Sequence, residues 1–220
     1  MARLKLFLFL LALFPVFRWL WLGFNDGLGA NPPEFLIRST GIWALVALWL
    51  TLAVTPLRRL LHQPALLRVR RMLGLFAFFY TALHLLGWAY WERGWSIASM
   101  WDDVVDRPFI TVGVIAFVPM LALACTSTHG WMRRLGRRWQ TLHRSVYAIA
   151  VLSVLHFWLV RSGKNDFSEP YAYATVLALL LFFRVVHSLK ARVKPSVSPV
   201  SGHQERRRIA SAGTASEKRQ

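Results

Sequence analysis

The stretch WQTLHRSVYAIAVLSVLHFWLV, residues 139–160, is long and apolar enough to cross a bilayer as one helix, and it carries His143 and His156. A third histidine, His84, lies in a second apolar stretch, RRMLGLFAFFYTALHLLGW at residues 70–88. An imidazole is costly in the hydrocarbon region, so histidines within spanning segments are functional candidates. The two stretches therefore indicate membrane helices that carry a functional site.

The remaining sequence repeats this apolar character. The chain has 220 residues, of which 55% are hydrophobic, and it contains 11 Trp, a composition far too apolar for a soluble domain. Because lipid-exposed backbone must satisfy its own hydrogen bonds, apolar stretches of this length are expected to be helical. The predicted fold is an all-α membrane protein, a six-helix transmembrane bundle with spans at about 5–24, 40–57, 72–91, 108–127, 141–160 and 171–189.

The two ends of the chain differ in character. The first apolar segment follows basic residues, as in a signal peptide, but Trp19 and Trp21 stand where a small-residue cleavage site would lie. We therefore expect a retained helix, within a membrane domain that covers residues 1–190. Residues 191–220 are polar and rich in Ser and basic side chains, which predicts a disordered basic cytoplasmic tail.

Charge divides the connections between spans into two kinds. The formal net charge is +17, and basic side chains without any acid occupy 58–71 and 128–144. Eight of the ten acids lie instead in 25–38, 92–107 and 161–170. Basic loops face the cytoplasm in membrane proteins, so both termini are predicted to be cytoplasmic in a bacterial inner membrane. The positive charge is thus assigned to topology and to contact with the lipid bilayer, and not to nucleic acid.

Depth relates two of the histidines. His84 and His156 both lie four to five residues from the acidic ends of helices that start at basic loops, so their imidazoles are expected at similar depth. Two neutral imidazoles from facing helices can hold one iron axially, which gives a b-type haem suited to electron transfer. The alternative is a pair of hydrogen-bonded interior histidines.

His143 lies thirteen residues before His156, which places it roughly 20 Å deeper on a helix and about 140° around its axis. We expect it to ligate a second, inner haem. Counting back thirteen or fourteen residues from His84 gives Arg71 and Arg70, which are candidates for the haem propionates or the axial side of an unusual site. Other candidate ligands are the remaining histidines near this end, His62, His129 and His187.

The pattern RxLGL…FFYxxLHxxxW on the third span and WxxLHRxxYxxxxxxxxHF on the fifth resembles the ferric-reductase-like transmembrane family over roughly residues 5–190. The stretches NPPEFLIRSTGIWAL (31–45) and TPLRR (55–59) support the resemblance. It implies that His84, His143 and His156 are axial ligands of one or two haems b, and that FMN is a further cofactor.

The same resemblance implies a role. The chain would be a non-catalytic electron-transfer subunit that takes electrons from quinol and passes them to a separate periplasmic molybdopterin-dependent methionine sulfoxide reductase, MsrP. Broader relatives carry two histidines on the third helix, where this chain has Arg70 or Arg71. They also continue into a flavin- and NADPH-binding domain, but no glycine-rich dinucleotide loop follows a strand here. Electrons are therefore expected from a quinol or a separate protein.

Two alternative functions remain at this point. One is a stand-alone transmembrane ferric or quinone reductase. The other is a transporter with proton-relay histidines, although the six spans carry no acid and the sequence shows no convincing internal repeat. The lone Cys125 excludes a disulfide or a Cys-ligated iron–sulfur cluster within one chain.

Overall fold

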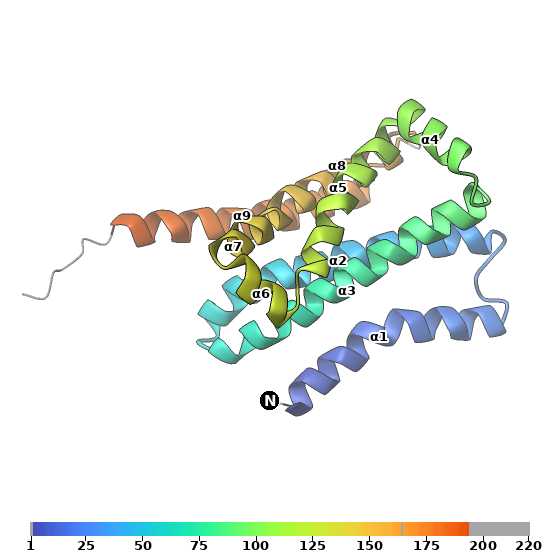
Figure 1. Cartoon of the computed structure of the whole chain (residues 1–220). Coiled ribbons are helices and arrows are strands. Elements are labelled where there is room, and N and C mark those ends of the chain that lie inside the picture. The colour runs from blue at the N-terminus through green and yellow to red at the C-terminus, as the bar shows by residue number, and fades with distance from the viewer. Residues whose placement is uncertain (1, 164, 194–220) are drawn as a thin grey trace, which may run out of the picture. The chain divides into compact units, whose positions relative to one another are not determined.

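The computed structural model describes residues 2–163 and 165–193, and within them it contains helices and no strands (Figure 1). The elements are α1 (Ala2–Phe24), α2 (Pro32–Leu60), η1 (Pro64–Leu66), α3 (Leu67–Gly87), the π-helix η2 (Trp88–Glu92), α4 (Ile97–Asp106), α5 (Pro108–Cys125), α6 (His129–Leu135), α7 (Arg137–Arg144), α8 (Val146–Ser162) and α9 (Ser168–Val193). The predicted all-α fold is confirmed. The predicted tail lies, from residue 194 on, outside the described residues.

Six helical segments are long and apolar enough to cross a membrane, as predicted. They are Arg3–Phe24, Pro32–Leu60, Pro64–Glu92, Pro108–Cys125, Arg137–Ser162 and Ser168–Lys190. Several begin earlier than hydropathy indicates, because a helix can start in polar sequence. In α2 the Asn31 side chain accepts a hydrogen bond from the backbone N–H of Glu34, and Pro32 occupies the first turn, so the helix begins eight residues before the apolar run.

The chain forms two compact units, Met1–Phe183 and Arg184–Gln220, and the packing described here is that of the first. Its helices form two antiparallel pairs: α2 packs along α3, and α5 packs along α8 (Figure 1). Buried side chains from both pairs meet in one core cluster, which includes Leu48, Tyr80, Met120 and Ile149. Both pairs therefore contribute to the same interior.

The first helix joins this core through aromatic contacts. Trp19 donates its indole N–H to the Ser39 hydroxyl at 2.9 Å, and its ring meets that of Tyr80 edge-on. The Tyr80 hydroxyl in turn donates to the backbone carbonyl of Ala12. These bonds matter because a buried indole or phenol without a partner is costly in a membrane interior.

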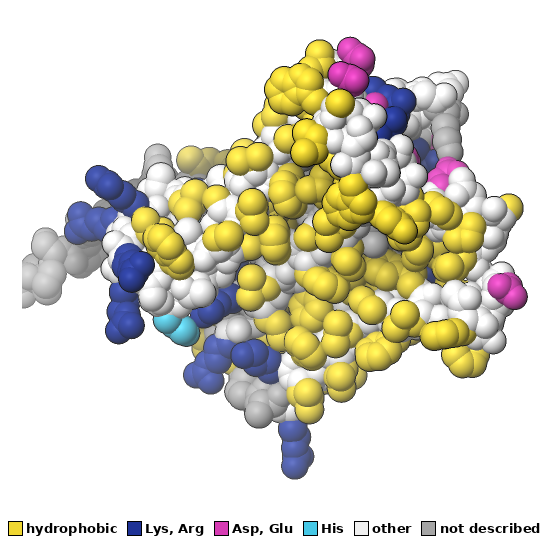
Figure 2. All heavy atoms as spheres, turned by 45° about the vertical axis from the view of Figure 1, so that its right-hand side comes forward, with side chains coloured by type: hydrophobic (Ala, Val, Ile, Leu, Met, Phe, Trp, Pro, Cys, Tyr) yellow, Lys and Arg dark blue, Asp and Glu magenta, His cyan; other side chains and the backbone are white. Residues whose placement is uncertain are grey.

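Acidic side chains gather at one end of the first unit, where a few basic side chains lie beside them, and most of the other basic side chains lie toward the opposite end (Figure 2). We call the end with the connections 25–31 and 93–107 and the α8–α9 connection the acidic end. The opposite end, with connections 61–66 and 126–136, is the basic end. The separation of charge follows the alternation of loops seen in the sequence.

The sequence suggested a simple loop at the acidic connection 92–107, but this connection contains helix α4. Asp103 of α4 is only 6% exposed and lies 2.5 Å from the Arg93 guanidinium and 3.2 Å from that of Arg107. The two arginines neutralise this buried carboxylate. The exposed face of α4 carries Ile97 and Trp101.

Two alanines on α8 differ in burial, and this difference allows a test of the core packing. Ala150 is 1% exposed, whereas Ala148, two residues earlier on the same helix, is exposed. Ala150→Leu should destabilise the protein by about 1–3 kcal/mol, because a close-packed interior has no room for the added methylenes. Ala148→Leu should leave the midpoint of thermal unfolding in detergent nearly unchanged. Equal midpoints for the two variants would contradict this account of the α8 interface.

Candidate functional site

His84 of α3 and His156 of α8 face one another inside the first unit. Their ring centroids are 6.0 Å apart and the ring planes are nearly perpendicular, at 82°. The predicted match in depth is therefore confirmed, and the two helices also turn both imidazoles toward the same space.

Each ring is held by a backbone carbonyl of the neighbouring helix. His84 Nδ1 lies 2.8 Å from the carbonyl oxygen of Ile37, and His156 Nδ1 lies 2.6 Å from that of Phe109. Both partners precede their histidine by 47 residues. A carbonyl can only accept, so Nδ1–H must donate, and in a neutral ring the lone pair is then on Nε2. Both imidazoles are thus fixed in the tautomer that a metal ion can bind through Nε2.

A glycine lies against each ring, four residues after the carbonyl that the ring bonds. A Cβ atom on Gly41 would lie 3.1 Å from the His84 ring, and one on Gly113 would lie 3.0 Å from Nδ1 of His156. Only glycine lets these rings approach the backbone without displacement. The sequence did not point to either glycine by itself, although each precedes its histidine by the same number of residues.

The helix pairs α2–α3 and α5–α8 therefore repeat one local design of carbonyl, glycine and histidine. Thr81 and Ser153 each lie three residues before a histidine, and their hydroxyls donate to backbone carbonyls one turn earlier in their own helices, at 2.7 and 2.8 Å. The two halves of the site are equivalent in construction as well as in ligand type.

Both histidines line a cavity of about 710 Å³ between α2, α3, α5 and α8. Its deep part is apolar, with Leu48, Met120 and Ile149, and its rim at the acidic end is polar. A volume within the roughly 300–1,000 Å³ of small-molecule sites, apolar walls and two convergent imidazoles suit a flat organic cofactor.

The spacing of the rings permits one metal ion between them. Metal–imidazole bonds of about 2.0–2.1 Å on opposite sides of an ion place the ring centres roughly 6 Å apart, as observed here. Among the described residues no group of three or more His, Cys, Asp and Glu side chains could hold a bare metal ion. An iron carried by a macrocycle needs only the two axial nitrogens, so the residues present fit haem.

His143 lies apart from this cavity. It belongs to α7, which ends at Arg144, and a turn at Ser145 separates it from α8. Its ring stacks on Trp139 with centroids 3.9 Å apart, and its Nδ1 lies 3.1 Å from the Trp139 carbonyl oxygen. The predicted single helix through both histidines is thus two helices, and the expected angle of about 140° between them does not apply.

The other predicted residues lie near the basic end. Arg71 places a guanidinium nitrogen 3.2 Å from Nε2 of His129, and Arg70 is close enough to His143 for a charge interaction. His62 is exposed in the turn after α2, and His187 belongs to the second unit. Within the described part of the first unit, Arg70, Arg71, His62 and His129 are not among the residues that line the cavity.

Comparison with known proteins supplies a family. Residues 40–154 match the family described as "Ferric reductase like transmembrane component". The chain is 62% identical to the protein-methionine-sulfoxide reductase heme-binding subunit MsrQ of Bordetella pertussis, over 84% of this chain and 89% of the relative. It is 55% identical to the MsrQ of Ralstonia nicotianae, over 84% and 86%, and 50% identical to that of Herminiimonas arsenicoxydans, over 88% and 89%. No solved structure is significantly similar to the chain.

Proposed function

Since the chain belongs to the ferric reductase-like transmembrane family, alongside the MsrQ haem-binding subunits, we propose that it carries electrons through b-type haem across the bacterial inner membrane. One observation carries the proposal: two tautomer-fixed imidazoles face each other across a cofactor-sized cavity. The chain contributes axial ligands and a low-dielectric surround, and the redox chemistry is that of the haem.

In this proposal His84 and His156 are the axial ligands of one haem. The donation of each Nδ1–H to a carbonyl makes Nε2 a better electron donor and prevents the ring from rotating. A haem held by both imidazoles would supply electron transfer and not binding of oxygen or substrate, because His84 and His156 would occupy both of its free positions. The apolar cavity wall excludes water from the iron.

A second haem would use His143, whose ring is held by hydrogen bonds to the backbone carbonyls of Trp139 and Leu123. Arg70, which interacts with His143, and Arg71, which contacts His129, are the candidates for a propionate or for the axial side. The proposed cofactor set is therefore one or two haems b, with FMN implied by the family resemblance and assigned to no residue.

For partners we propose quinol as the electron donor and a periplasmic molybdopterin-dependent reductase, MsrP, as the acceptor. The basic end then faces the cytoplasm and the acidic end faces the periplasm, in accord with the positive-inside rule. The His84–His156 pair lies toward the acidic end, on the side of the acceptor. The system would repair oxidised methionine in periplasmic proteins.

A reduced-minus-oxidised optical spectrum of the purified chain tests the haem. We expect a sharp Soret and α-band change typical of low-spin b-type haem, and a haem-to-protein ratio of one or two. A cofactor-replete preparation without these bands would contradict the proposal. The ratio also decides whether His143 has a cofactor to bind.

Partner assignment needs a separate experiment with the haem reduced. In vesicles, quinol should reduce the haem, and MsrP with methionine sulfoxide should reoxidise it, whereas MsrP without the sulfoxide should support at most one turnover. The family description favours one alternative, a stand-alone ferric reductase. Reoxidation by a ferric chelate at the same rate, with no response to MsrP, would favour that alternative and contradict the proposed acceptor.

A further inference from the structure

Three arginines, Arg38, Arg107 and Arg161, line the rim of the cavity that holds His84 and His156. Arg38 and Arg107 are exposed, but Arg161 at the end of α8 is only 7% exposed. A buried guanidinium in a membrane protein loses its hydration, so its neighbours must repay a large cost.

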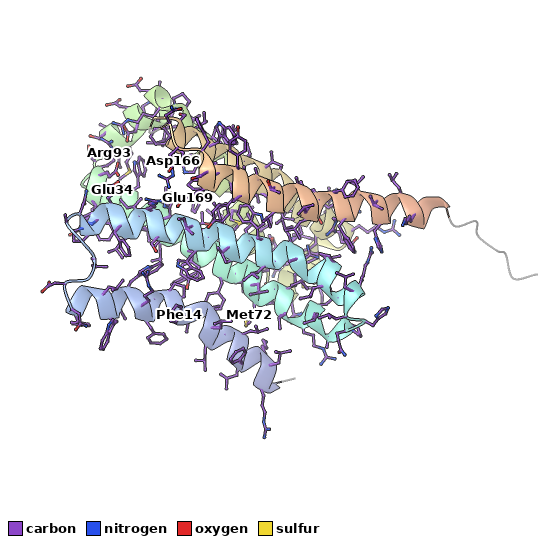
Figure 3. All side chains as sticks on the ribbon, turned by 180° about the vertical axis from the view of Figure 1, so that it is seen from behind. Phe14, Glu34, Met72, Arg93, Asp166 and Glu169 are labelled. Carbon is purple, nitrogen blue, oxygen red and sulfur yellow. The ribbon has the colours of Figure 1, made fainter. Side chains whose placement is uncertain are left out.

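Two carboxylates of the α8–α9 region hold Arg161 in place. One of its terminal nitrogens pairs with Glu169, and the other lies 3.7 Å from Asp166 (Figure 3). Glu169 is shared, since Arg38 of α2 approaches it to 2.9 Å. Hydrogen bonds from Ser168 hold the pKa of Asp166 below its usual value, so this carboxylate stays ionised at neutral pH. Arg161 is therefore held in place beside the cavity by two carboxylates.

The ion pairs do not use the whole guanidinium. Nε of Arg161 is buried and has no hydrogen-bond partner, and the group lies over the Phe157 ring, 5.9 Å from its centroid. Arg93 provides a comparison, because it also pairs with a buried carboxylate at the acidic end but does not line the cavity. Arg93 shows that an arginine can join two segments through an ion pair without lining the cavity. Because Arg161 lines the cavity, its positive charge also acts on the molecule that the cavity holds.

We propose that Arg161 is a cofactor-facing charge that binds a carboxylate group of the haem and raises the reduction potential of the His84–His156 site. The ion pairs leave the Nε–H of Arg161 free to donate to such a carboxylate, and at close range in a low-dielectric cavity the guanidinium favours the iron state with one positive charge fewer. Glu169 acts in the opposite sense, because its negative charge offsets that of Arg161. The inference rests on the proposed function, since it requires haem in this cavity.

The experiment is an optical redox titration of the purified holoprotein and four variants. Arg161→Gln should lower the midpoint potential, by about tenfold in the reduced-to-oxidised ratio at a fixed applied potential, which is 59 mV for one electron. Glu169→Gln should raise it. Arg161→Lys keeps the charge but loses the Nε–H donor, so its shift should be smaller than that of Arg161→Gln. Arg93→Gln is the matched control and should leave the potential unchanged.

Opposite signs for Arg161→Gln and Glu169→Gln support the proposal, because a purely structural ion pair would shift both variants alike or neither. Unchanged potentials in both, or equal shifts in Arg93→Gln, would overturn it. If Arg161→Gln fails to fold, Glu169→Gln decides: a rise relative to Arg93→Gln supports the proposal and no rise overturns it. Absence of haem from the unmodified protein would instead overturn the proposed function.

Discussion

His84→Ala and His156→Ala should each abolish the low-spin spectrum of the haem in the cavity. Each substitution removes one of two axial nitrogens, and the ring spacing of 6.0 Å leaves no other described histidine in position to replace it. We expect loss of the bound haem or conversion to a five-coordinate high-spin form. The measurement is haem content together with the reduced α-band of the purified variants.

His62→Ala is the matched control, because this histidine is exposed and does not line the cavity. Its spectrum should equal that of the unmodified protein. His143→Ala should keep the spectrum of the His84–His156 site and lose only the contribution of an inner haem. Full retention of the low-spin spectrum in both cavity variants would refute the assigned ligand pair.

Gly113→Val should weaken haem binding almost as strongly, although glycine supplies no ligand. Its Cβ would lie 3.0 Å from Nδ1 of His156, a ring already held by the Phe109 carbonyl at 2.6 Å. The ring must give way, and with the larger valine side chain this would weaken its bond to the carbonyl and displace Nε2 from the position proposed for haem binding. Loss of such an outer contact typically costs about 10- to 100-fold in metal affinity. Gly41→Val should act in the same way through His84.

The control for the glycines is Gly74 on α3. A Cβ there would meet only the Thr51 methyl group at 3.7 Å, an ordinary contact between packed helices. Gly74→Ala should therefore keep full haem occupancy, measured by the pyridine haemochrome method on protein of equal purity. If Gly113→Val also kept full occupancy, the close approach of ring and backbone would have no functional importance.

The cavity and its ion pairs combine two kinds of constraint. Carbonyls and glycines fix the orientation of the ligands, as at Ile37 and Gly41, whereas Arg161 and Glu169 set the charge at the rim. In the proposed function, the first kind would decide whether haem binds, and the second would set its reduction potential. The predicted variants separate these effects because occupancy and midpoint potential are measured independently.

Sequence alone led to the six spans and to the His84–His156 pair, and the structure agrees on both. Hydropathy is a local property, and depth along a helix follows from counting residues at about 1.5 Å each. Both inferences require only the position of a residue along the membrane normal. They do not require knowledge of which helices are neighbours.

What the sequence did not reveal depends on rotation and contact. The loop 161–170 looked merely balanced in charge, yet its arginine is buried against the cavity and its Glu169 reaches across to α2. Likewise, the turn at Ser145 separates His143 from the helix of His156.

The sequence by itself thus determined the number of spans, their order and the similar depth of His84 and His156. Only the tertiary structure decided that Gly41 and Gly113 abut the imidazoles and that Arg161 lines the cavity. The physical reason is that hydrophobicity specifies how far a side chain lies along the membrane normal. Packing between helices decides which way the side chain faces and what it touches.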